Sequence, residues 1–115
     1  MAKRVVILVR RAPLAHSATT EAVRIALGQT LADHAVTLLY IDDGAGAAGA
    51  LKPELTGGEV FDEALALLEA CNVRQAVEQS SLTRARIGKP RAAVEVIDRA
   101  AALALINGAD VLVGL

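Results

Sequence analysis

The sequence predicts one α/β domain, with three α/β/α layers and a mainly parallel five-stranded sheet. Short apolar runs alternate with segments of helical spacing along the chain, which is typical of βα units. The clearest of these runs, residues 5–9, carries no charge, as expected for a strand buried on both faces of a parallel sheet. With 115 residues, 54% of them hydrophobic, the chain suffices for one core, so we expect a single domain over residues 1–115.

The first βα unit is the clearest in the sequence. Residues 5–9 form a β-branched apolar run bounded by charged residues, which predicts a strand. Ser17 is placed to cap a helix over residues 18–32, and Glu21 in its first turn favours the same start. We therefore expect strand one to be followed by the first crossover helix.

The middle of the chain predicts a strand, a loop and a helix. Residues 35–41 are short and β-rich, and the turn-forming residues 42–44 end them. Residues 44–58 are rich in Gly and Ala, which predicts a mobile loop. Residues 59–71 have an apolar stripe at helical spacing, and Asn72 is a suitable C-cap.

The last third of the chain repeats the pattern with shorter elements. We expect a strand over 73–77, a helix over 80–85, a strand over 92–96, a helix over 99–106 and a strand over 111–115.

Composition excludes several classes of function. The net charge of −1 and the 2% of aromatic residues argue against nucleic acid as a partner. No apolar run is long enough for a signal segment or a membrane span, so we expect no membrane partner. Cys71 is the only cysteine and cannot form an internal disulfide, which favours a reducing, cytoplasmic setting.

Cys71 is the only thiol nucleophile the sequence offers, and its position favours a structural role. It follows Leu68 by three residues and completes the apolar stripe, so we expect it in the core. The C-terminal end of a helix also opposes thiol ionisation. A catalytic role for Cys71 is the alternative.

Ligands of parallel sheets bind at the carboxyl ends of strands, so candidate binding residues are expected in the segments that follow the strands. Arg10 and Arg11, with the helix start at Ser17, form a possible anion site; the alternative is two solvated arginines. Asp42 and Asp43 indicate a turn rather than a metal site, because adjacent side chains of a strand point apart. The glycines match no nucleotide-binding pattern, and we expect no metal and no cofactor.

Polar residues also follow the third strand. Ser80 and Ser81 are expected to cap a helix, because the glycines of a nucleophile elbow are absent around them. His34 is expected in a solvated loop. A basic cluster follows, which is either a partner surface or a solvated loop; its members are Arg84, Arg86, Lys89 and Arg91.

Taken together, the motifs resemble the DsrE/DsrF-like superfamily and, within it, the DsrF/TusC branch of sulfur-relay proteins. The resemblance extends from end to end and lies in the order and spacing of short segments. The matching segments are residues 3–9, Ala12-Pro13, the helix start from Ser17 through Ala22, residues 36–44, residues 73–82 and residues 109–113.

This resemblance implies a functional position. Catalytic members carry persulfide sulfur on a cysteine just after the third strand, and the matching residue here is Glu78. The resemblance therefore implies an accessory, non-catalytic subunit with Glu78, Gln79, Ser80 and Ser81 facing a cleft or a partner. It also implies a homo-oligomer, as a trimer or hexamer, or a hetero-oligomer with other DsrE-like subunits, and a sulfur-carrier protein as a possible partner. Two alternatives stay open: sulfur transfer by Cys71, and a small anion-binding regulatory module.

Overall fold

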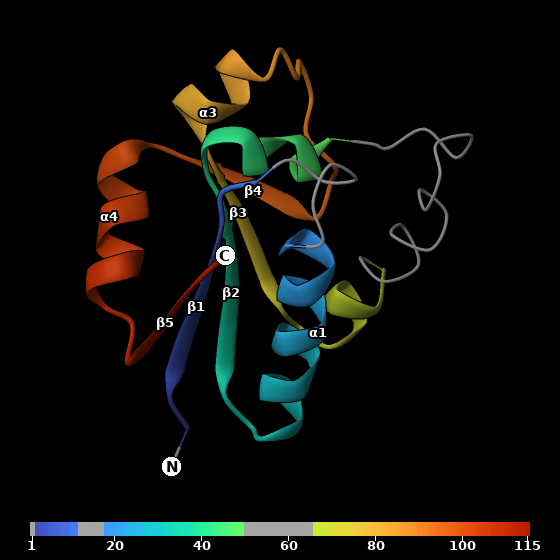
Figure 1. The fold of residues 1–115 in the computed structure, drawn as a ribbon, viewed down its shortest axis with the longest axis vertical. Helices are drawn as coiled ribbons and strands as arrows, with labels where there is room; N and C mark the ends of the chain where they lie inside the picture. The colour runs from blue at the N-terminus through green and yellow to red at the C-terminus, as the bar shows by residue number, and fades with distance from the viewer. Residues whose placement is uncertain (1, 12–17, 50–65) are drawn as a thin grey trace.

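The computed structural model describes residues 2–11, 18–49 and 66–115 (Figure 1). Residues 66–70 are helical and precede β3. The labelled elements are β1 (Arg4–Val9), α1 (Ala18–Leu31), β2 (Ala35–Tyr40), the 3-10 helix η1 (Asp42–Ala48), β3 (Arg74–Glu78), α3 (Gln79–Arg84), β4 (Val94–Ile97), α4 (Arg99–Asn107) and β5 (Val111–Gly114). Each predicted strand and each fully described helix is therefore found, with ends shifted by one or two residues.

The five strands form one sheet in the order β4-β3-β2-β1-β5, and all neighbouring pairs are parallel. The chain steps from β1 to β4 in one direction and then returns to place β5 beside β1. Because parallel crossovers are right-handed, this reversal puts α4 on the opposite face from α1. Figure 1 shows α1 and α4 on opposite sides of the sheet, which confirms the three-layer α/β/α fold.

The core has two parts, one on each face of the sheet. On the first face, Ile7 and Leu38 pack against Ala26 of α1 and Leu68 of the helical segment 66–70. On the second face, α4 covers a smaller cluster; its buried members are Val6, Leu8, Leu39, Ala76, Ile97 and Ala102. Alternate strand residues thus point to opposite layers, and β1 is buried on both faces, as the uncharged run at residues 5–9 predicted.

The predicted mobile loop over residues 44–58 needs correction in its first part. Residues 44–48 belong to η1, and their small buried side chains pack closely beneath α3. Residues 50–58 lie outside the described residues. Arg91 also fixes η1, because its backbone N–H donates to the Ala48 carbonyl at 2.7 Å. The segment is ordered by these tertiary contacts, which composition does not reveal.

Cys71 is exposed, so the prediction that it lies in the core was wrong. The helix ends at residue 70, and Asn72 adopts a left-handed conformation with φ 61°, as expected of a C-cap. The N–H of Val73 then donates to the Leu68 carbonyl, which closes the helix end. Only Leu68 of this last turn reaches the core, because the chain turns away before the apolar stripe continues to Cys71.

Among the residues described, no helix combines the length and hydropathy required to cross a membrane.

Candidate functional site

The candidate site lies at the carboxyl edge of the sheet, where β2 and β3 end beneath α3 and beside the start of α4. Glu78 is the last residue of β3 and is 4% exposed. A carboxylate this buried needs hydrogen-bond donors or a nearby positive charge. The sequence placed Glu78 just after the strand; the structure keeps it within the strand and directs it into this site.

Glu78 is held by three donors from the start of α3. Its Oε2 accepts the backbone N–H of Ser80 at 2.5 Å, and its Oε1 accepts the Ser80 hydroxyl at 2.5 Å and the Ser81 hydroxyl at 3.2 Å. Glu78 is therefore the N-cap of α3. The expectation that a serine caps this helix was wrong, because the longer carboxylate folds back onto the N–H while both serines donate to it.

Ser81 connects this cap to η1. Its buried Oγ accepts the backbone N–H of Asp42 at 2.9 Å. Arg84 donates to Asp42 Oδ1 at 3.2 Å and to Ser81 Oγ at 3.4 Å. Asp42 has φ 50°, and these contacts hold it in that left-handed conformation where the strand turns into η1. The expectation that Asp42 and Asp43 mark a turn is confirmed.

The pKa of Glu78 lies below its ordinary value of 4.5. Burial raises this pKa, but the hydrogen bonds from Ser80 and Ser81 and the positive charge of Arg99 together outweigh burial. The carboxyl group is therefore ionised at neutral pH. An ionised, fully hydrogen-bonded carboxylate suits a cap and an electrostatic anchor rather than a general acid.

We expect Glu78→Gln to destabilise the protein by about 1–3 kcal/mol at neutral pH, because one amide N–H₂ would face donors where the carboxylate accepts. Since the folded pKa is below the unfolded value of 4.5, the stabilisation by Glu78 is fully present above pH 4.5 and is lost as the pH falls through the folded pKa. Urea unfolding across this range measures the difference between wild type and variant. A difference that stays constant into acid would contradict the assignment.

Two adjoining pockets share Asp42 and Ser81 at this edge. One, of about 110 Å³, lies between Glu78 and α4 and is walled by Ala102, Leu103 and Ile106, with Arg99 at its border. The other, of about 290 Å³, lies between η1 and α3 and is bordered by Arg84. The structure therefore brings the predicted residues Glu78 and Ser81 into one cleft.

Gln79 and Ser80 are exposed at the same edge of the sheet. Ser80 presents its hydroxyl to Glu78 from the surface, and Gln79 donates no side-chain hydrogen bond to a described residue. Contact of these two residues with a partner stays a prediction, and Glu78 and Ser81 are buried beside them.

Cys71 lies at the opposite end of β3 from Glu78. Cys71 precedes β3, and Glu78 is the last residue of β3. All five residues of β3 lie on the path between them, and at the rise of an extended strand β3 alone spans roughly 13 Å. The exposed thiol is therefore remote from the candidate site.

The predicted anion site is only partly described. Arg10 and Arg11 are exposed after β1, while Ser17 lies outside the described residues. The backbone N–H of Arg10 donates to the Leu115 carbonyl and ties β1 to the end of β5. His34 is half-buried, and its Nδ1 accepts the N–H of Lys3 at 3.1 Å, so it closes the turn before β2.

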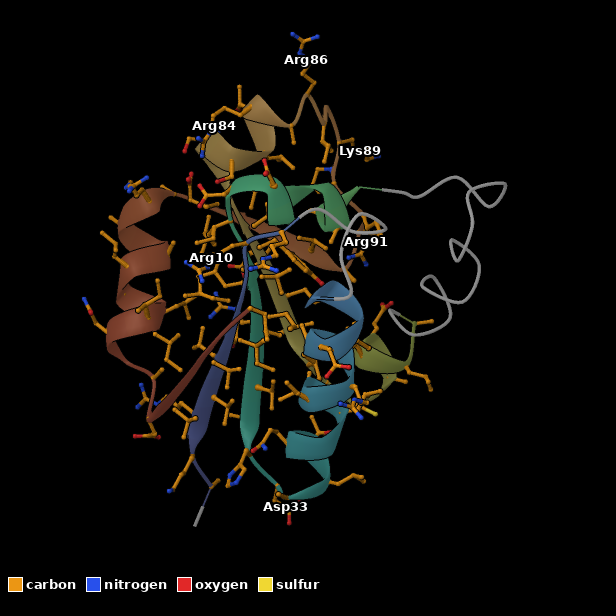
Figure 2. All side chains as sticks on the ribbon, in the orientation of Figure 1. Arg10, Asp33, Arg84, Arg86, Lys89 and Arg91 are labelled. Carbon is orange, nitrogen blue, oxygen red and sulfur yellow. The ribbon has the colours of Figure 1, made fainter. Side chains whose placement is uncertain are left out.

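The basic cluster divides into two groups. Figure 2 shows Arg84, Arg86 and Lys89 around α3 and the turn that follows it. Arg91 instead lies against η1, where Nη2 donates to the Ala47 carbonyl at 2.7 Å and to Gln75 Oε1 at 3.0 Å. It therefore does not belong to the solvated patch that the sequence suggested.

Sequence reasoning missed the buried network that Arg91 completes. The Tyr40 hydroxyl donates to Gln75 Oε1 at 2.8 Å. Burial raises the pKa of Tyr40 to about 12, although Arg91 acts to lower it. Gln75 Nε2 is buried without a hydrogen-bond partner among the described residues. The available signal was a glutamine at an inward-facing position of an apolar strand.

Within residues 2–11, 18–49 and 66–115, no three His, Cys, Asp or Glu side chains are grouped to hold a metal ion.

Comparison with known proteins identifies the architecture. No protein-family model and no curated protein sequence matches the chain. Among solved structures, the YchN protein of Escherichia coli superposes with a TM-score of 0.78 over 100% of both chains, at 20% sequence identity. YchN has a DsrE/DsrF-like fold. The chain has the DsrE/DsrF-like fold. At this identity the likeness establishes the fold, and the function must be argued from the site. In this chain, the candidate site is formed around a carboxylate, that of Glu78.

Proposed function

We propose that this protein is an oligomeric accessory subunit in intracellular sulfur relay, of the DsrF/TusC type, that supports sulfur transfer by partner subunits without carrying sulfur itself. The observation that carries the proposal is Glu78 at the end of β3. The sequence resemblance implies a sulfur-carrying cysteine at this position. A carboxylate has no thiolate to accept sulfane sulfur, so the relay chemistry would belong to a partner.

The surroundings of Glu78 support this role. Its oxygens accept bonds from Ser80 and Ser81, which use the carboxylate to fix the start of α3. That fixed helix presents Gln79 and Ser80 at the surface of the cleft. The proposal assigns this surface to a DsrE-like partner subunit or a sulfur-carrier protein in a reducing cytoplasmic compartment.

A sulfur carrier that uses Cys71 is the second candidate, and one observation favours it. The thiol is exposed in the folded protein, so reagents and donors can reach it. Its position at the other end of β3 separates it from the cleft. Thiol reactivity alone therefore does not distinguish the candidates, and transfer of sulfur onward does.

The test is an intact-mass measurement after incubation with a small persulfide donor, for wild type and Cys71→Ser. We expect wild type to gain sulfur no faster than a simple exposed thiol and to pass none to an acceptor thiol, and Cys71→Ser to gain none. Both proteins should stimulate transfer by a catalytic DsrE-like subunit equally. Rapid loading of wild type with onward transfer, abolished in Cys71→Ser, would replace the accessory role by the carrier role.

A further inference from the structure

A pocket separate from the candidate site lies at the amino-terminal edge of the sheet, on the face that α4 covers. Its volume is about 230 Å³, which is small beside the pockets that hold drug-sized ligands. In Figure 1, β1 and β2 begin beyond the last turn of α4, which leaves this end of the face open. Two arginines and a threonine line the pocket, and none of the described residues that line it is acidic.

Three neighbouring strands direct the polar side chains of this pocket to one face of the sheet. Arg74 on β3 pairs with Thr37 on β2. Thr37 also pairs with Val6 of β1, which lies two residues after Arg4. Because paired residues and alternate residues share a face, Arg4, Thr37 and Arg74 point to the same side. The two arginines stand on the strands that flank β2, roughly 10 Å apart across the sheet, so one small ligand can lie between them.

The guanidinium of Arg4 has hydrogen-bond donors left for a ligand. Asp110 engages the backbone of Arg4, because its carboxylate accepts the Arg4 N–H at 2.8 Å and its own N–H donates to the Arg4 carbonyl at 2.8 Å. Within the described segments, the Arg4 guanidinium forms no ion pair. Its Nη1 lies 3.6 Å from the position of a Cβ on Gly108, the C-cap of α4, where a positive charge also offsets the negative end of the helix.

Arg74 is oriented by Glu95 on β4. The Nε and Nη2 atoms of Arg74 lie 3.0 and 2.9 Å from Glu95 Oε2. Both side chains are about half exposed, so the pair contributes little to stability, but it fixes the guanidinium and leaves Nη1 for another acceptor. Glu95 itself does not line the pocket.

The pocket has one polar wall and one apolar wall. The sheet provides the two guanidinium groups and the hydroxyl of the half-buried Thr37. The opposite wall includes Ala104 and Leu105 of α4. Guanidinium groups bind carboxylate and phosphate oxygens in preference to other acceptors, and an apolar wall favours a ligand with an apolar part.

We propose that this pocket binds a small organic oxyanion, whose carboxylate or phosphate group is held by Arg4, Arg74 and Thr37 and whose short apolar part packs against α4. The chain has a net charge of −1, so the attraction is local to the two arginines and not a property of the whole surface. The pocket lies at the opposite edge of the sheet from Glu78, and the proposal does not depend on a role in sulfur relay.

Backbone-amide NMR shifts of the full chain, recorded at constant ionic strength, measure the binding of four probes: acetate, benzoate, inorganic phosphate and phenyl phosphate. We expect saturable shifts around Thr37 and Arg74. Benzoate and phenyl phosphate should bind about tenfold more tightly than acetate and phosphate, because their rings bury apolar surface. The tighter of the two aromatic probes identifies the preferred anionic group. Absence of saturable shifts with all four probes, or equal affinity with and without the ring, overturns the proposal.

Variants separate anion binding from a purely structural role of the arginines. Arg4→Gln and Arg74→Gln should each weaken benzoate binding by about tenfold. Glu95→Gln should not weaken it, because this change removes a carboxylate that competes for Arg74. The matched control is Arg24→Gln, since Arg24 on α1 is exposed, pairs with Glu21, and changes the net charge equally. If Glu95→Gln or Arg24→Gln weakens binding as much as Arg74→Gln does, the proposal is overturned.

Discussion

Replacing Gly44 by alanine is expected to destabilise the protein by about 3 kcal/mol, near the upper end for overpacking. A Cβ at this position would lie 2.0 Å from the carbonyl oxygen of Val9 and 2.6 Å from its carbon. Both are backbone atoms at the end of β1, so no side chain can swing away. The chain must separate η1 from β1, which would also displace Asp42 from Ser81.

Urea and thermal unfolding measure this effect. For a domain of this size, the loss corresponds to a fall in Tm of more than about 10 °C. Gly28→Ala is the matched control, because a Cβ there meets nothing within 4 Å and the residue lies inside α1. We expect that control to stabilise the protein by about 0.5–1 kcal/mol. If the two variants are equally stable, the close approach of η1 to β1 is wrong.

Glu78→Cys in the Cys71→Ser background is expected to convert a chain that gains no sulfur into one that gains a single sulfur atom from a persulfide donor. The new thiol would face the N–H and hydroxyl donors of Ser80 and Ser81 and the charge that lowers the pKa of Glu78, all of which favour a thiolate. The pocket of about 110 Å³ beside Glu78 leaves room for sulfur.

Intact-mass spectrometry detects the gain, and alkylation rates across pH report the thiolate. The comparison is the Glu78→Cys, Cys71→Ser protein with Ser80→Ala added. This change removes one hydroxyl donor beside the new thiol and should slow its alkylation near neutral pH. A Glu78→Cys protein that is folded yet inert to both reagents would show that this position lacks the environment for sulfur chemistry. The proposed role of Glu78 as a replacement for a sulfur carrier would then lose its support.

The sequence by itself determined the architecture and the position of the site. The uncharged β-branched run at residues 5–9 favours burial on both faces, and its alternation with helical segments favours a parallel sheet between helices. The order of the elements then places Glu78 at the carboxyl edge, because parallel strands all end on the same side. These features depend on local pattern and chain order, and both are written in the sequence.

Only the tertiary structure decided which side chains meet. The Gly/Ala segment could not be recognised as ordered, because η1 is fixed by Arg91, more than forty residues away. Cys71 does not reach the core because the next residue, Asn72, adopts a left-handed conformation that turns the chain away. Glu78 rather than a serine caps α3, because a carboxylate buried at the end of β3 needs hydrogen-bond donors and the start of α3 provides them. Contacts between distant residues depend on packing in three dimensions, which the periodicity of the chain does not contain.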